Sequence, residues 1–352
     1  GIYMKVIDLH CDTIYEILAG RKRGEHIGLR KNRLMLDLER MQQGGYFLQN
    51  FALFVEKKQG ESPFDMFKEL LDVFNMEIKE NEDLIAKVLT TDDMQENEKA
   101  GKMSALLTVE GGEACEGKLE NLKYLYEQGV RMMTLTWNFP NEIGYPNFDE
   151  SRDFFTPNME EGLTETGILF VEEMERLGII VDVSHLSDAG FYDVLKYTKR
   201  PFVASHSNAR SICPWVRNLT DDMIRRLADR GGVTGLNYCA DFLRKPAVQE
   251  KAEKNKSEEK ERLIRNGRQA SKEGYADLED IARHARHIVD IGGIECLGLG
   301  SDFDGIPAYQ GCPKAERIDE LADVLAKNGF HEREIDKIFY QNAFRLYQEV
   351  LG

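Results

Sequence analysis

A histidine and a carboxylate stand two residues apart near the start of the chain, at His10 and Asp12. They follow the largely apolar run Val6–Leu9, which is typical of a buried strand. Residues i and i+2 of a strand point to the same side, so the two side chains could bind one cation while Cys11 points away. Because (β/α)8 barrel enzymes place their chemistry at the C-terminal ends of strands, the pair favours a metallohydrolase on such a barrel. A polar turn after the strand is the simpler alternative.

Acidic and histidine side chains also follow other apolar runs. Glu110 ends the third run, His185 the fifth, His206 the sixth, and Asp302 and Asp304 the eighth. Taken alone, each is more often a hydrogen-bonded core histidine or a helix cap than a metal ligand. Together they converge on one barrel mouth, which makes coincidence the weaker explanation. Imidazole and carboxylate groups in combination suit Zn²⁺ and related divalent ions.

The number of candidate ligands indicates more than one metal ion. Three histidines and at least three carboxylates exceed what one tetrahedral ion needs. Two ions about 3.5–4 Å apart would fit if Glu110 lay between them, since a carboxylate offers one oxygen to each ion and offsets their repulsion. We therefore expect two divalent metal ions as cofactors, with zinc as the first candidate.

The elements that must position these residues alternate along the chain. Eight short runs rich in Val, Ile, Leu and Phe are predicted strands: Val6–His10, Phe47–Val55, Ser104–Glu110, Val130–Trp137, Ile179–His185, Phe202–His206, Gly232–Tyr238 and Cys296–Asp302. Segments with apolar spacing of three and four are predicted helices: Phe64–Lys87, Leu119–Gln128, Glu165–Leu177, Ala189–Thr198, Thr220–Asp229, Ala276–Ile291, Ile318–Lys327 and Glu332–Val350. Strands that are apolar on both faces and alternate with helices indicate βαβ units and a parallel sheet. Eight such units predict the α/β class, as a closed (β/α)8 TIM barrel of the metal-dependent hydrolase type.

Residues 1–352 show no domain boundary and are predicted to form one barrel domain. The highly charged segment 241–274 follows the seventh strand, so we expect an insertion on the active-site face. Charge runs usually face water, which favours a solvated helix; a lid or a subunit contact is the alternative. His284 and His287 lie three apart on a predicted outer helix, and we expect both at the surface.

Composition excludes several classes of protein. The chain has 352 residues, of which 42% are hydrophobic and 31% charged, with a net charge of −16. This acidic balance argues against a nucleic-acid partner, and no apolar stretch approaches the ~18 residues of a membrane span. The six cysteines form no C-x-x-C pair, which is typical of reduced thiols. With no signal peptide or lipid-anchor tail in view, we expect a cytoplasmic protein.

These motifs together resemble the membrane (renal) dipeptidase family of zinc metallopeptidases, as a microbial cytoplasmic member. The resemblance runs from about Asp8 to the C-terminus, and the order and spacing of the motifs make it specific. The motifs are His10-x-Asp12, Glu110-Gly111-Gly112, Ser184-His185, Ser205-His206-Ser207 and Gly300-Ser301-Asp302-Phe303-Asp304-Gly305.

The resemblance implies a role for each site residue. His10, Asp12 and Glu110 would hold one zinc ion, and Glu110, His185 and His206 the other. Asp302 matches the acid/base aspartate of the family. An arginine shortly after the last ligand histidine would bind the carboxylate of the substrate; Arg217 is the match and Arg210 the competing candidate.

One departure from the family pattern concerns the fourth strand. Mammalian members have a histidine directly after Thr-Leu-Thr, where it contacts the reacting carbonyl. Here Trp137 and Asn138 follow that motif. The indole N–H of Trp137 could donate one hydrogen bond, or Asn138 could substitute for the histidine. We therefore count both as candidate substrate-binding residues.

The sequence predicts a metal-dependent dipeptidase that cleaves the amide bond of small dipeptides through a hydroxide bridging the two metal ions. A different amide or phosphoester hydrolase on the same binuclear barrel is the first alternative, since fold and metals do not determine the substrate. A metal-dependent binding protein without turnover is the second. The expected partner is a dipeptide, with no nucleic acid and no membrane, and a homodimer is left open.

Overall fold

The computed structural model describes residues 4–244 and 276–352. Most of the predicted charged insertion, 241–274, lies outside these residues, so both the insertion and the single-domain arrangement stay predictions.

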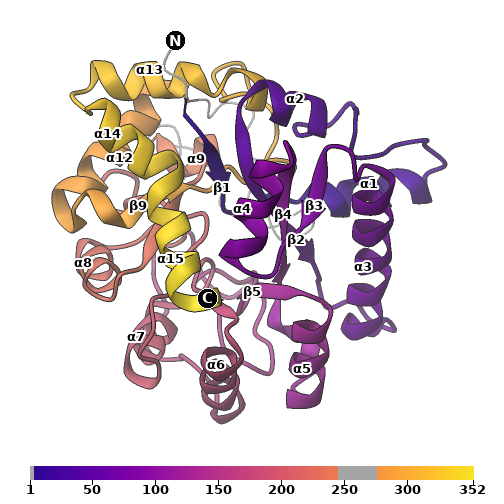
Figure 1. Cartoon of the computed structure of the whole chain (residues 1–352). Coiled ribbons are helices and arrows are strands. Elements are labelled where there is room, and N and C mark those ends of the chain that lie inside the picture. Colours follow the sequence, from indigo (N-terminus) through magenta and orange to yellow (C-terminus); the bar gives the residue numbers. More distant parts are fainter. Residues whose placement is uncertain (1–3, 245–275) are drawn as a thin grey trace.

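Parallel strands form a closed barrel at the centre of the molecule, and helices form a ring around it (Figure 1). Within the described residues, eight strands make up the barrel: β1 (Val6–Asp8), β2 (Tyr46–Phe54), β4 (Met103–Glu110), β5 (Val130–Thr134), β6 (Ile180–Asp182), β7 (Val203–Ala204), β8 (Val233–Leu236) and β9 (Leu297–Leu299). Pairing runs from β1 through β2, β4 and the following strands to β9, and β9 pairs with β1. The predicted (β/α)8 barrel is confirmed, and all eight predicted strands are present.

An additional strand, β3 (Ile85–Lys87), corrects the prediction of one helix over Phe64–Lys87. The helix, α3 (Pro63–Glu80), ends earlier because Asn81 donates its side-chain amide to the Glu77 carbonyl and closes the last turn. The chain then turns back and β3 pairs with the first residues of β4, outside the closed barrel.

The helices begin where the sequence offers polar caps. Ser187, Thr164 and Thr220 each accept a backbone N–H in the first turn of the helix that follows. Besides α3, the helices of the described residues are α1 (Thr13–Lys22), α2 (Leu38–Gln43), α4 (Thr91–Lys99), α5 (Leu119–Glu127), α6 (Glu165–Leu177), α7 (Asp188–Tyr197), α8 (Asp221–Asp229), α9 (Ala240–Leu243), α12 (Leu278–Gly292), α13 (Asp319–Lys327), α14 (Glu332–Asp336) and α15 (Asn342–Leu351). A π-helical turn, Lys337–Gln341, joins the last two, so the single predicted C-terminal helix is interrupted.

Helix α15 closes the N-terminal end of the barrel and lies across the strands in Figure 1. Its buried face packs on the residues that fill the barrel interior: Ile7, Leu48, Leu106, Met132, Ile180, Val203 and Val233. The Tyr347 hydroxyl donates to Asn50 Oδ1 inside the barrel at 2.7 Å. With this end closed, the opposite end, where the strands finish, is left for chemistry.

The prediction that both histidines of α12 lie at the surface is confirmed for His287 and wrong for His284. His287 is partly exposed and forms an ion pair with Asp221. His284 is fully buried, where it accepts the Ala209 backbone N–H and contacts the Leu243 carbonyl. It therefore ties the loop after β7 and the end of helix α9 to the outer helix.

Candidate metal centre at the barrel mouth

The predicted ligands lie at strand ends or just beyond them. Glu110 is the last residue of β4, whereas β1 already ends at Asp8. His10 and Asp12 belong to the segment after β1, which an isolated bridge between Cys11 and Phe303 holds against the segment after β9. The strands therefore carry the segments that bear the ligands, rather than most of the ligands themselves.

His10 is at the centre of one group of ligand atoms. Its Nε2 lies 3.2 Å from Asp12 Oδ2, 3.5 Å from Glu110 Oε1 and 3.5 Å from Asp302 Oδ1. All four side chains are buried. Asp302, expected as an acid/base, is thus as close to this group as the predicted ligands are.

The other oxygen of Glu110 faces a second group. Oε2 lies 3.2 Å from His185 Nε2 and 3.3 Å from His206 Nε2, and these two nitrogens are 3.2 Å apart. The rings of His10 and His206 stack with centroids 3.9 Å apart, which holds the two groups side by side. Glu110 thus divides its oxygens between two groups, as a bridging carboxylate would.

The charges of this cluster influence one another strongly. Burial opposes the charged form of His10, but Glu110 and Asp12 outweigh it and raise the pKa of His10 to about 10. Burial also opposes the charged form of Glu110 and would raise its pKa, yet the adjacent His10 holds the pKa of Glu110 well below its ordinary value. Burial also raises the pKa of Asp302 well above its ordinary range and lowers that of His185 to about 4.

The donor set fits divalent cations. Three carboxylates, Asp12, Glu110 and Asp302, are buried around the single imidazole of His10, and so much buried negative charge costs free energy unless further positive charge compensates it. Ligand atoms of His10, Glu110 and His206 lie close enough together to share one ion, and so do those of His10, Asp12 and Asp302. Imidazole and carboxylate donors of this kind suit zinc and neighbouring metals.

Two site residues have backbone conformations that residues other than glycine rarely adopt. His185 has φ of 73° and Asp302 has φ of 63°, both in the left-handed region. Such conformations cost about 1–3 kcal/mol each and persist where the surrounding contacts impose them, often at functional sites. Asp304 shares this conformation at φ 65°. Its carboxylate accepts the Thr13 hydroxyl and the Met35 backbone N–H, so it is held away from the ligand groups.

Two buried carboxylates that the sequence analysis did not single out hold the ligand segments together. Asp8 accepts the backbone N–H and the hydroxyl of Ser301, directly before Asp302. Asp182 accepts the backbone N–H groups of Ser184 and Ser205, which directly precede the two candidate ligand histidines. An acidic residue at the end of an otherwise apolar strand is the sequence signal that could have revealed both.

The two candidate arginines have different surroundings. Arg210 forms a two-pronged pair with Asp188, at 2.8 and 2.9 Å, and also bonds two backbone carbonyls. Arg217 is buried beside the site, donates to Ser207 Oγ and the His206 carbonyl, and keeps its Nε without a hydrogen-bond partner among the described residues. A buried guanidinium with a spare donor is suited to an anionic ligand.

The residues that replace the family histidine lie next to His185. Asn138 Oδ1 is 3.1 Å from His185 Nδ1, and an amide oxygen can only accept, so it assigns the ring proton to Nδ1. Trp137 is buried with its ring against Phe54 and Phe139. Their roles as substrate contacts stay predictions.

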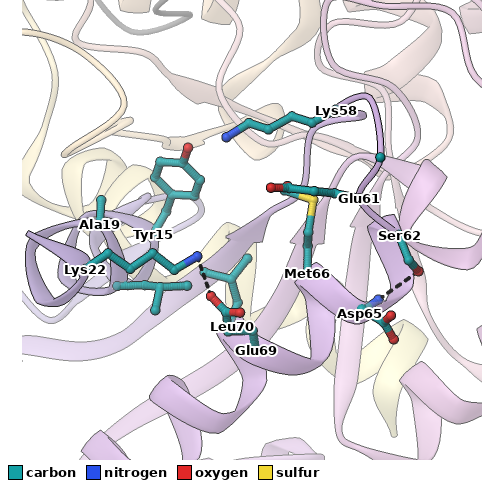
Figure 2. A pocket seen from close by; sticks show the side chains of 12 residues that line it. Tyr15, Ala19, Lys22, Lys58, Glu61, Ser62, Asp65, Met66, Glu69 and Leu70 are labelled. Atoms are coloured by element: carbon teal, nitrogen blue, oxygen red, sulfur yellow. Dashed lines mark hydrogen bonds and ion pairs between the residues drawn. The ribbon is translucent and has the colours of Figure 1, made fainter.

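A separate cavity of about 550 Å³ lies between α1 and α3 (Figure 2). Lys22 pairs there with Glu69, and the Ser62 hydroxyl accepts the Asp65 N–H. Within the described part of the chain, none of the five predicted metal ligands lines this cavity. The chemistry suggested by the sequence therefore lies at the barrel mouth and not in this cavity.

Comparison with known proteins shows the family of the chain. The family model described as membrane dipeptidase, peptidase family M19, matches residues 3–351. An uncharacterised dipeptidase of Schizosaccharomyces pombe is 31% identical over 330 residues, which cover 89% of this chain and 71% of that protein. A crystal structure of a family M19 dipeptidase superposes with a TM-score of 0.85 at 26% identity over 99% of both chains. A metallopeptidase from Rhodobacter sphaeroides, solved with a phosphinate mimic of the dipeptide L-Ala-D-Ala, gives 0.83 at 26% identity, also over 99% of both.

Among the helices of the described residues, none has the length and apolar character that a bilayer span requires.

Proposed function

The chain belongs to the membrane dipeptidase family, peptidase family M19, and is a metal-dependent dipeptidase; we propose that it acts through a binuclear zinc site with Asp302 as the acid/base and Arg217 as the substrate anchor. The observation that carries this proposal is that the two carboxylate oxygens of Glu110 face two separate groups of candidate ligand atoms. A cytoplasmic location and a homodimer stay predictions.

The proposed ligands are distributed over both groups. His10, Asp12 and Glu110 would hold one ion, and Glu110, His185 and His206 the other. Two bound divalent ions would lower the pKa of a water molecule and polarise the scissile carbonyl. Support comes from the distances of 3.2–3.5 Å among these donor atoms and from their burial.

Asp302 is proposed to transfer the proton of the attacking water molecule to the leaving amine. Its carboxylate is 3.5 Å from His10 and is held by Asn237, whose side-chain amide donates to Oδ2 at 3.3 Å. The raised pKa of Asp302, a consequence of its burial, suits a group that takes a proton from water and passes it to the leaving amine.

Arg217 is proposed to bind the free carboxylate of the dipeptide. A dipeptide has one C-terminal carboxylate at a short distance from its one amide, so anchoring the first determines the position of the second. The buried guanidinium with its spare Nε supports this role, whereas Asp188 already occupies Arg210.

The test is a hydrolysis assay on a panel of free dipeptides, including L-Ala-D-Ala, and on a phosphodiester, with and without added zinc. We expect zinc-dependent cleavage of dipeptides alone. Preferential cleavage of the phosphoester would contradict the proposed substrate, and metal binding without turnover on any substrate would contradict catalysis.

A further inference from the structure

Hydrogen bonds of Ser184, Ser205 and Ser207 connect the second ligand group to one buried carboxylate, that of Asp182. Ser205 Oγ lies 2.7 Å from His206 Nδ1 and also contacts Asp182 Oδ2. Ser184 Oγ accepts the His206 backbone N–H and lies 2.9 Å from Ser207 Oγ. A continuous chain thus runs from Asp182 through the Ser205 hydroxyl to the far nitrogen of His206.

The donors around Asp182 determine the direction of these hydrogen bonds. Its Oδ1 faces the backbone N–H groups of Ser184 and Ser205, which can only donate. Its Oδ2 faces the hydroxyls of Thr134 and Ser205. A fully buried carboxylate surrounded by four donors acts as an acceptor at every position, so the one hydroxyl proton of Ser205 points to Asp182.

The consequence reaches the metal site. With its proton committed to Asp182, Ser205 Oγ can only accept from His206, which assigns the ring proton of His206 to Nδ1. The lone pair is then on Nε2, the atom that faces Glu110 and His185. We propose that Asp182 is a positioning residue of the metal centre, which sets the tautomer of His206 through Ser205 so that Nε2 is ready to bind metal. The inference rests on the proposed metal site and adds a residue to it.

The same outcome is reached differently at His185, where an amide oxygen of Asn138 faces Nδ1 directly. Both histidines of the second group therefore present Nε2 to Glu110, one by a direct acceptor and one by a relay. Partners of this kind orient ligand histidines and contribute about 10–100-fold to metal affinity.

The relay makes an unusual prediction for Asp182→Asn. If the new amide nitrogen faces Ser205, it donates to Oγ, the hydroxyl proton turns to His206 Nδ1, and the ring proton is forced onto Nε2. Zinc affinity at the second position should fall by about 100-fold. Ser205→Ala removes the relay but forces neither tautomer, so its loss should be nearer to about 10-fold.

The double variant Asp182→Asn/Ser205→Ala separates a tautomer effect from simple damage. Without the hydroxyl nothing forces the wrong tautomer, so the double variant should bind zinc more tightly than Asp182→Asn alone. A purely structural role predicts the opposite, since removing two buried polar partners should cost more than removing one. Asp8→Asn is the matched control, because Asp8 is equally buried and accepts the hydroxyl and N–H of Ser301 but touches no ring nitrogen of His206.

The experiment measures zinc binding by competition with a chelator and the His206 tautomer by ¹⁵N NMR of the metal-free, histidine-labelled full chain, with thermal melting as the fold check. Recovery in the double variant, together with an Nδ1–H form in the wild type that Asp182→Asn converts to Nε2–H, supports the proposal. No recovery, or equal losses in Asp182→Asn and Asp8→Asn, overturns it.

Should Asp182→Asn fail to fold, an unchanged tautomer and affinity in Ser205→Ala overturns it, and a mixed tautomer with weaker binding supports it. Failure of wild type to bind zinc contradicts the proposed function, while the NMR result still decides the relay.

Discussion

At the scale of single residues, the barrel mouth contains two aspartates with similar sequence context and different environments. Asp302 and Asp304 are two apart, both are buried, and both have left-handed backbones. Asp302 faces His10, whereas Asp304 is committed to Thr13 and Met35. Hydrogen-bond partners, and not residue type, therefore distinguish the acid/base candidate from its neighbour.

Asp302→Asn should keep both metal ions and lower turnover by about 10²-fold or more, the usual effect of losing an acid/base group. The measurement is kcat on a free dipeptide together with metal content. Asp304→Asn is the comparison and should affect stability more than turnover. If Asp302→Asn loses a metal ion and keeps its rate per remaining ion, Asp302 is a ligand and Asp304 becomes the better candidate for the base.

Arg217→Met should lower kcat/KM on free dipeptides by a factor equivalent to about 2–4 kcal/mol, because a charged hydrogen-bond pair in a buried site is lost. Dipeptide amides lack the carboxylate, so on them the same change should have little effect. Measuring both substrates with both proteins gives the comparison. Equal losses on the two substrates would mean that the arginine is structural.

Arg210→Met is the matched control for the anchor. It removes a guanidinium of the same size from the same loop, but one that already pairs with Asp188. We expect lower thermal stability and no selectivity between free dipeptides and their amides. A selective loss in this variant would move the anchor from Arg217 to Arg210 and leave the dipeptidase activity intact.

At the scale of elements, the C-terminal helix α15 stabilises the barrel from the end opposite to the site. Leu346 and Tyr347 are buried against the side chains of the barrel interior, and the Tyr347 hydroxyl supplies the Asn50 side-chain oxygen with a donor. The packing of α15 and the candidate site therefore lie at opposite ends of the same strands, which is the usual division between stability and catalysis in this fold.

Leu346→Ala should lower the free energy of unfolding by about 2–5 kcal/mol, the range for a large-to-small change in a packed core. Tyr347→Phe keeps the ring and removes one buried hydrogen bond, so about 1–3 kcal/mol is expected. Denaturant unfolding measures both. KM and the metal content of the folded fraction should be unchanged, and a large shift in either would show that α15 also shapes the site.

At the scale of the whole molecule, the proposed metal ions would connect elements that are far apart in the sequence. The candidate ligands lie on the segments after β1, β6 and β7 and at the end of β4, and Asp302 adds the segment after β9. Ions that bind only the folded state stabilise it by mass action. Without them, the buried carboxylates repel one another across the barrel mouth.

Metal removal should therefore lower the melting temperature, and added zinc should restore it; at 100 times the Kd the gain is about 2.7 kcal/mol per site. Elemental analysis of the zinc-loaded protein should give about two ions per chain. Glu110→Gln should bind one ion per chain instead of two and should lose most of the zinc-dependent stabilisation. A firm value of one ion, with an unaltered response in Glu110→Gln, would contradict the bridging role.

The sequence by itself determined the barrel and the predicted ligand set. Apolar runs that alternate with helical spacing carry the fold class, because a parallel strand must be apolar on both faces to be buried. His10, Glu110, His185 and His206 could be found from their places at the ends of these runs, and the tertiary structure brings them together. The short strand Ile85–Lys87 was missed because a single apolar run after a helix has the same pattern as one more helical turn.

Only the tertiary structure decided how these residues are held. Asp8 and Asp182 stand out in the sequence as acidic ends of apolar strands, but nothing there identifies their partners Ser301 and Ser205, which are 293 and 23 positions away. The choice between Arg210 and Arg217 likewise depends on Asp188, which precedes both and lies on α7. Periodicity reports which face of an element is buried, but a hydrogen bond between separate elements depends on distances that only the folded barrel sets.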